Sequence, residues 1–440
     1  MSPQSKDKPV KNERPITGDG ETQTTTDLPP VRDSKPSFGK TFVGYVTTAN
    51  NVMVTIWSFV LAMFIGGLII AIFDDTVRKS FTYFFARPGD AFAAVGNAFG
   101  NAYVGLFEGA ILNVEALNEW IAGDGTFVQV LRPISETLTY SAPLICTGLA
   151  VGVAFKAGLF NIGAQGQAIM GAAGGLIVGF AIDAPMIIHL PLALIGGMLA
   201  GALYGAVPGV LKARTGAHEV ITSIMLNYVA ATALLWLIST EFVHHPTRND
   251  PISKAAAESA QLPQLLTFGG SALRMNLGII IAVLAAFVVW WLMSKSTLGF
   301  RMQSVGLNPD ASRTAGMSVP GTYATSMSLA GAFAGLGGAL LALGINPYAL
   351  TPDVAEQIGF DGITVALLGR ANPGGIVAAG LLFGAMRAGG KTMQDFMPLD
   401  MVTLLQALIV MFIAAPALVK TIVRLRTPKG GLSMMTAKGW

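Results

Sequence analysis

The sequence predicts an all-α, polytopic membrane protein with about ten transmembrane helices, some of them short or broken. Hydrophobic residues make up 52% of the 440 positions and charged residues only 12%, whereas soluble domains contain roughly 25% charged residues. The mean hydropathy is +0.58. The chain also has 52 glycines, and small residues are typical of membrane helices because they let backbones approach closely.

The N-terminal region differs from the rest of the chain. Residues 1–48 are rich in Lys, Asp, Thr and Pro and poor in large apolar residues. Such a composition cannot offset the entropy lost on ordering, so we expect a disordered tail. The first uncharged apolar run, 53–73, spans about 30 Å as a helix, which matches one bilayer core. It starts too far into the chain, and runs too long, for a cleaved signal peptide.

Nine further apolar segments follow this first span. They are 133–155, 164–182, 187–211, 219–239, 276–293, 321–343, 358–369, 374–388 and 399–418. Segment 358–369 covers only roughly 18 Å as a helix, too little for a straight crossing. Either it begins earlier, near Asp353, or this pair of segments contains a broken helix. Together the spans define a membrane domain over residues 49–420, followed by a basic tail over 421–440.

The distribution of charge predicts how the chain is oriented. With the N-terminus in the cytoplasm, the cytoplasmic loops hold Lys156, Lys212, Arg214, Lys295, Arg301, Arg313 and Arg370. The C-terminal tail then adds further Lys and Arg and no acid. The insertion at 74–130, which would lie outside, has seven acidic residues against three basic ones. Because Lys and Arg near span ends stay inside, both termini are expected in the cytoplasm.

A cluster of amides in AGLFNIGAQGQAIMGAAGG, residues 157–175, lies beside glycines in apolar surroundings. Polar side chains at membrane depth are tolerated where they meet a cavity, a partner helix or unwound backbone. An amide offers both donor and acceptor to a neutral polar solute, and an aromatic face stacks on a base. The alternative is a cytoplasmic turn followed by a helix packed through its glycines. The candidate solute-path residues are Phe160, Asn161, Gln165 and Gln167, together with Asn227 and Phe360.

The break at 294–320 contains GLNPDASRTAGM and predicts a short polar helix outside the membrane. Asn308 is a helix cap, Pro309 suits the first helical position, and Asp310 suits the positive end of the helix dipole. Gly316 supplies a left-handed stop. A capped polar helix between two spans is a point of attachment for a soluble partner.

Other chemistry has weaker support in the sequence. Four acids near span ends, Glu136, Glu219, Glu356 and Asp361, are candidates for an ion-coupled secondary transporter. AMRAGGKT loosely matches a phosphate loop but lacks the preceding strand, so the chain is expected to have no ATPase of its own. His218 and the His244-His245 pair have no partner at ligand spacing, so no metal site is expected. A clustered catalytic constellation, as a membrane enzyme on lipid-linked substrates requires, is missing from the sequence. A net charge of +3 gives no case for nucleic acid.

Four motifs occur together over roughly residues 130 to 420. They are GLFNIGAQGQ, RTGAHEVITSIMLNY, GLNPDASRTAGM and GFDGITVALLGRANPGGIVAAGLLFGAM. In order and spacing they resemble the permease subunits of bacterial ABC importers of the ribose, branched-chain amino acid and nucleoside group. NIGAQGQ, HEVITSIMLN and the GNAYVGLFEGA stretch of the insertion are most similar to the nucleoside branch, with a simple sugar such as ribose as the alternative solute. The long N-terminal tail departs from the family pattern.

This resemblance implies a multi-pass permease in the bacterial cytoplasmic membrane. It implies three partners: two cytoplasmic ATPase domains, a second permease that is identical or a sister chain, and an external solute-binding lipoprotein. ATP and Mg would bind to the ATPase domains, and this chain would bind no cofactor. The motif GLNPDASRTAGM resembles the coupling helix that contacts the ATPase. The implied coupling residues are Asn308, Pro309, Asp310, Ala311, Arg313 and Gly316.

Overall fold

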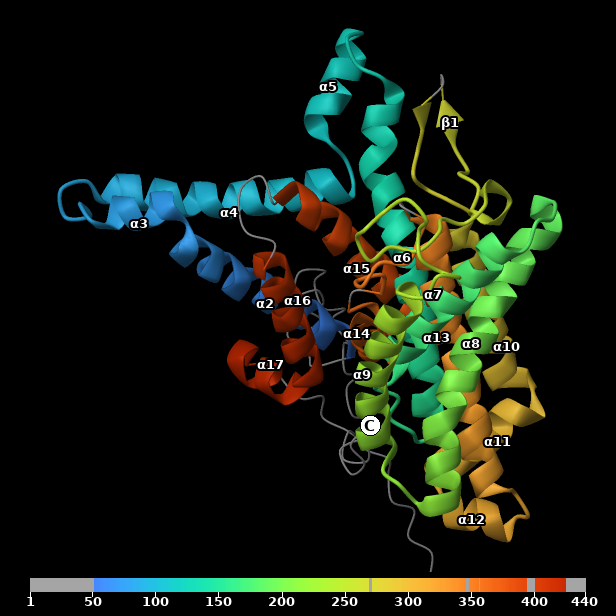
Figure 1. Cartoon of the computed structure of the whole chain (residues 1–440). Helices are drawn as coiled ribbons and strands as arrows, with labels where there is room; N and C mark the ends of the chain where they lie inside the picture. Colours follow the sequence, from blue (N-terminus) through green and yellow to red (C-terminus); the bar gives the residue numbers. More distant parts are fainter. Residues whose placement is uncertain (1–50, 269–270, 346–347, 356, 394–399, 425–440) are drawn as a thin grey trace, which may run out of the picture. The chain divides into compact units, whose positions relative to one another are not determined.

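The computed structural model describes residues 51–268, 271–345, 348–355, 357–393 and 400–424. Its helices are α2 (Asn51–Phe73), α3 (Asp75–Phe81), α4 (Pro88–Ala110), α5 (Val114–Ala122), α6 (Phe127–Lys156), α7 (Ala164–Ala181), α8 (Met186–Thr215), α9 (Glu219–Ile238), α10 (Gly278–Lys295), α11 (Thr297–Leu307), α12 (Pro309–Thr314), α13 (Val319–Gly344), α14 (Ile358–Leu368), α15 (Pro373–Met393), α16 (Asp400–Ala414) and α17 (Pro416–Val423). Two minor elements join them: a 3-10 turn, η1 (Glu258–Ala260), and an antiparallel ribbon of β1 (Thr267–Phe268) with β2 (Ser271–Ala272). The predicted all-α membrane fold is confirmed (Figure 1).

Seven helices in the described part of the chain are long and apolar enough to cross a membrane: α2, α6, α7, α8, α9, α10 and α13. The short apolar helix α14 begins at Ile358, not near Asp353. The structure therefore excludes the earlier start, and the region consists of the short helix α14 followed by α15, as the broken-helix alternative describes. The expected disordered tail at 1–48 lies outside the described residues, as does the C-terminal tail beyond Arg424.

Three predicted boundaries differ from the structure. Helix α6 begins at Phe127, inside the predicted insertion. The last span is interrupted, because Pro416 has no backbone N–H to continue the helix from α16 and instead starts α17. The break at 294–320 contains a second helix, α11, whose N-cap Ser296 accepts a hydrogen bond from the Gly299 amide (3.0 Å).

Helices α6 and α13 form the centre of the bundle. In their most apolar stretches 89% and 83% of residues are buried, against 28% for α8, α9 and α10. The outward faces of α8 and α10 carry large apolar side chains such as Leu203 and Phe287, 72% and 59% exposed. Because lipid tails solvate such side chains, these helices are suited to the outside of the bundle.

A glycine seam joins α13 to α7 and α8. A Cβ atom on Gly335 would lie 2.3 Å from the Gly197 carbonyl oxygen, and one on Gly338 would lie 1.9 Å from the Ala168 oxygen. The same holds for Gly201, where a Cβ would approach the Gly331 oxygen to 2.3 Å. The three backbones therefore touch directly, which is how membrane helices gain packing energy without a hydrophobic drive between them.

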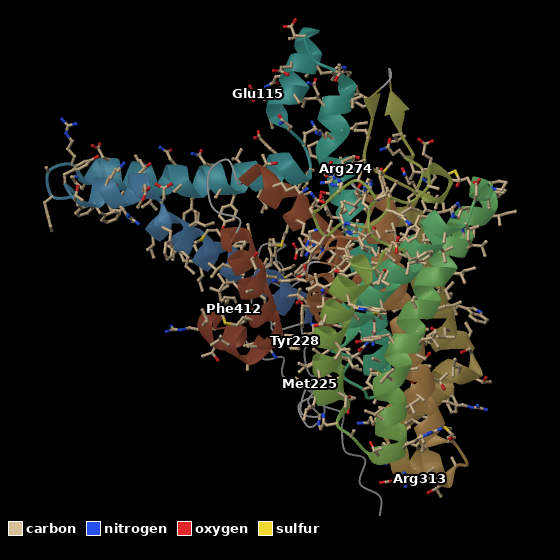
Figure 2. The ribbon with its side chains drawn as sticks, in the orientation of Figure 1. Glu115, Met225, Tyr228, Arg274, Arg313 and Phe412 are labelled. Carbon is tan, nitrogen blue, oxygen red and sulfur yellow. The ribbon has the colours of Figure 1, made fainter. Side chains whose placement is uncertain are left out.

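A second, smaller core lies between α2 and the C-terminal helices α16 and α17. It contains the buried residues Ala62, Leu405, Ile409, Phe412 and Val419. Figure 2 labels Phe412 at this contact. The Ser58 hydroxyl donates to the Phe412 carbonyl (3.2 Å), which adds a polar link between the first and last parts of the described membrane domain.

Candidate solute path and coupling helix

The connection between α6 and α7 is an irregular turn over residues 157–163. Gly158 has φ +71°, a left-handed conformation that favours glycine. A Cβ there would also lie 2.9 Å from the Gly306 Cα at the end of α11. The turn therefore packs against the region of the chain that leads into α12.

This turn reaches into the bundle. The Gln167 amide nitrogen would lie 3.2 Å from a Cβ placed on Gly205 of α8, and Gly205 is roughly 15 Å along the helix from the Thr215 end. Asn161 is fully buried and Gln167 is 1% exposed. Helix α7 then packs through Gly171 and Gly174 against α13 and α8, so the structure has the turn followed by a glycine-packed helix, with the amides of Asn161 and Gln167 buried beside it.

Asn161 and Gln167 are paired with each other. The Asn161 Nδ2 donates to Gln167 Oε1 (2.9 Å), and the Gln167 Nε2 donates to Asn161 Oδ1 (3.1 Å). A buried amide without a partner would cost about 1–3 kcal/mol, and this reciprocal pair avoids that penalty at two side chains together. Their hydrogen bonds link the turn to the first turn of α7.

Asn227 of α9 forms hydrogen bonds with the backbone of the same turn and of the start of α7. Its Oδ1 accepts from the Gly166 amide (2.9 Å), and its Nδ2 donates to the Ile162 carbonyl (3.0 Å). An unwound backbone leaves donors and acceptors without helical partners, and membrane interiors offer no water to replace them. Asn227 supplies one of each.

Gln165 joins the turn to the short helix α14. Its Nε2 donates to the Ala355 carbonyl (2.6 Å), and its Oε1 accepts from the Gly359 amide (2.8 Å). A Cβ on Gly359 would lie 2.1 Å from the backbone nitrogen of Gln165, so this close approach of the two backbones requires glycine. The structure therefore brings all four predicted amides together, and each one bonds within the chain.

The aromatic candidates are more accessible. Phe160 is half-buried and lies 5.1 Å from Phe155 between ring centroids, and Phe360 on α14 is 45% exposed. The sequence analysis missed Tyr228, which is 70% exposed near the middle of α9 and directly follows Asn227 (Figure 2). A phenol in the centre of a span is poorly suited to lipid tails, and this mismatch was a signal available in the sequence.

Three of the four acidic candidates form ion pairs. Glu136 pairs with Arg274 (2.9 Å), Glu219 with Lys212, and Asp361 with Arg387 of α15 (2.9 Å). Burial opposes the charge on Arg274, but the carboxylate of Glu136 raises the pKa of Arg274 above its usual value. Glu356 lies outside the described residues.

Helix α12 has the predicted caps. The Asn308 Oδ1 accepts from the amides of Asp310 and Ala311, both at 3.1 Å, and Pro309 occupies the first helical position. Gly316 has φ +82° with open space around it. Asp310 and Arg313 are highly exposed and 3.6 Å apart. Figure 2 shows Arg313 at the opposite end of the helical bundle from Glu115.

In the described part of the chain, no group of three or more His, Cys, Asp or Glu side chains lies close enough together to bind a metal ion. His189 is fully buried and has structural partners, with its Nδ1 2.7 Å from Ser259 Oγ and its Nε2 3.0 Å from the Val178 carbonyl.

The described residues form a bundle of membrane helices with a buried amide cluster at the turn between α6 and α7 and a capped polar helix, α12, outside the spans. These are features of a membrane transport subunit that works with a soluble partner. The chain belongs to the family described as "Branched-chain amino acid transport system / permease component", which matches residues 134–414. It is thus a permease subunit of an ABC transporter, a multi-pass protein of the cytoplasmic membrane. This membership removes the ion-coupled transporter and the lipid-linked enzyme as alternatives. In general terms, it implies an ATPase and a solute-binding protein as partners.

Several relatives carry names of solutes. The chain is 41% identical to the guanosine ABC transporter permease protein NupP of Bacillus subtilis, over 70% of this chain and 88% of the relative. It is 39% identical to the nucleoside ABC transporter permease protein NupB of Lactococcus lactis, over 68% and 82%. It is also 35% identical to the glucose ABC transporter permease protein TsgB13 of Haloferax volcanii, over 65% and 78%. No solved structure matches the chain.

Proposed function

We propose that this permease imports nucleosides, driven by a separate cytoplasmic ATPase that binds ATP and Mg, and supplied by an external solute-binding lipoprotein. The observation that carries the solute class is the similarity to the guanosine and nucleoside permeases, 41% and 39% identical. The site chemistry is compatible with it, because accessible aromatic rings stack on bases without requiring charge. A simple sugar is the second candidate, supported by the glucose permease at 35% identity.

The solute path in this proposal follows the wall formed by α9, the 157–163 turn and α14. Tyr228, Phe160 and Phe360 supply accessible or half-buried aromatic surface along that wall. The amides of Asn161, Gln165, Gln167 and Asn227 fix the shape of the wall through the bonds described above. In this arrangement the amides position the aromatic rings, and the rings contact the solute.

The second permease in this proposal is a sister chain rather than another copy. The relatives occur in pairs with the same named solute: in Bacillus subtilis NupP is 41% and NupQ 28% identical to this chain. In Lactococcus lactis NupB is 39% and NupC 27% identical. The unequal similarity within each pair supports a division into two permease types. This chain belongs to the type of NupP and NupB, and the proposed sister chain belongs to the type of NupQ and NupC.

Both chain ends face the cytoplasm in this orientation, and α12 is the coupling helix. The positive-inside distribution supports it, since Lys212, Arg301 and Arg313 lie at or near the end of the bundle that carries α12. ATP binding would move the two coupling helices of the permease pair together. Reversing a 1:99 equilibrium between access states takes about 5.5 kcal/mol, which ATP binding can provide.

A pull-down tests the coupling assignment. Proline cannot adopt φ +82°, so Gly316→Pro should distort the end of α12, and Ala311→Glu adds a charged side chain at an exposed position of the same helix. The double change should therefore abolish co-purification of the ATPase from mild detergent. Gly316→Asn is the matched control and should retain the ATPase, since asparagine tolerates a left-handed conformation. Mass spectrometry identifies the co-purified subunits. An ATPase that remains bound to the double variant would place the contact elsewhere.

Uptake measurements test the solute and its path. Tyr228→Ala and Phe360→Ala should each lower uptake of labelled guanosine about tenfold, corresponding to the loss of about 1.4 kcal/mol of stacking. Leu203→Ala, an equally exposed change on the outer face of α8, should leave uptake unchanged. Competition by unlabelled nucleosides but not by glucose is expected. Competition by glucose alone would replace the nucleoside assignment with the sugar assignment.

A further inference from the structure

We propose that residues 74–92, which we call the aromatic hairpin, anchor the permease in the headgroup layer of the membrane where α2 emerges from the lipid. The aromatic hairpin comprises α3, the connection 82–87 and the start of α4. This role concerns lipid contact and is independent of the proposed solute.

The depth of the aromatic hairpin is set by α2. This 23-residue helix is about 34 Å long, slightly longer than one bilayer core. Asp74 follows it at once and caps α3, with its Oδ1 accepting from the amides of Thr76 (2.8 Å) and Val77 (2.9 Å). The chain therefore turns at the boundary of the lipid core, and α4 runs crosswise to α8 and α10 (Figure 1).

The tip of the aromatic hairpin is a cluster of exposed rings. Phe81, Tyr83, Phe85 and Phe92 are 53%, 45%, 100% and 71% exposed. Phe84 stacks on Phe81 with ring centroids 5.5 Å apart and meets Phe92 at 6.0 Å. An apolar cluster of this kind is costly in water, whereas interfacial membrane segments bury Phe at the boundary between headgroups and acyl chains and place Tyr at the headgroups.

The surroundings of the tip fit headgroups better than a protein partner. Arg78, Lys79 and Arg87 flank the rings and are exposed. Together with three carboxylates in the same stretch they give no net charge, so side chains of both signs can pair with the charged groups of phospholipid heads. A lipid-facing stripe on α2, formed by Phe64, Leu68 and Ile72 at 57%, 42% and 63% exposure, leads directly to the hairpin. The aromatic surface thus continues a surface that faces lipid.

Site-directed spin labelling in nanodiscs tests this anchor. Cys146 is the only cysteine and is fully buried, so an introduced surface cysteine is labelled selectively. Phe85→Cys and Tyr83→Cys are the test positions, Phe64→Cys is the lipid reference and Glu115→Cys on α5 is the water reference. At both test positions we expect collisions with oxygen to exceed collisions with a water-soluble nickel complex, with label depths between the two references.

Nickel accessibility at positions 83 and 85 equal to that at position 115 would overturn the anchor. The anchor would also be overturned if the labels at positions 83 and 85 were shielded from the nickel complex only after an external protein is added, because the hairpin would then be covered by protein and not by lipid. The labels are read in nanodiscs without other subunits, so the outcome does not depend on the solute or on the ATPase.

Discussion

Gly335→Leu is expected to remove folded permease from the membrane. A side chain at Gly335 would meet the Gly197 carbonyl oxygen at 2.3 Å and the Gly201 Cα at 2.9 Å. These atoms are backbone, so no rotamer change can make room, and α13 would have to separate from α8. Overpacking costs about 1–3 kcal/mol where side chains can shift, and here we expect more. Fluorescence-detected size exclusion of a tagged protein gives the yield and the melting temperature.

The matched control for this change is Gly100→Leu on α4. A Cβ at Gly100 meets nothing within 4 Å, and leucine has a higher helix propensity than glycine. Wild-type yield and melting temperature are therefore expected. If Gly335→Leu gave a monodisperse protein with an unchanged melting temperature, direct backbone contact along the glycine seam would be wrong.

Asn161→Leu is expected to abolish most solute uptake. The change leaves both polar atoms of the Gln167 amide without the partner that they have in the native pair, at a cost of about 1–3 kcal/mol. We expect the turn, which also positions Phe160, to rearrange and relieve this cost, and so the wall of the proposed path would change. Uptake of several labelled nucleosides in cells, normalised to protein in the membrane, measures this.

The exchanged double variant, Asn161→Gln with Gln167→Asn, separates the pair from the individual residues. It keeps two amides facing each other, so we expect it to recover a substantial part of the uptake lost in Asn161→Leu. Binding of the ATPase should be retained in both variants, because neither changes a residue of α12. Normal uptake of every nucleoside by Asn161→Leu would exclude the amide pair from the transport path.

Local sequence signals predicted the parts of the fold that local forces determine. Long uncharged runs produced the spans, and the cap of Asn308 and the stop at Gly316 were predicted because both act within one helical turn. Helix α11 was missed although Ser296 provides a cap, since glycines at 299 and 306 weaken its helical pattern. The proline that divides the last span was also visible in the sequence.

The partners of the candidate site were beyond sequence reasoning because they come from distant elements. The pairing of Gln165 with Gly359 joins residues on α7 and α14, and Asn227 reaches the turn from α9. No spacing rule relates such positions. The gathering of these amides into one polar cluster was predicted correctly, but whether each amide bonds to the chain or to a solute depends on tertiary geometry.

The glycine seam has a mechanical consequence. Where backbones touch directly, as along α13, α7 and α8, no side chains can slide or repack, and these helices are expected to move as one rigid body. By contrast, α9 is attached to the turn through exchangeable hydrogen bonds of the Asn227 amide. Any rocking between inward and outward access should therefore bend at that amide link, with the three-helix centre acting as the fixed frame.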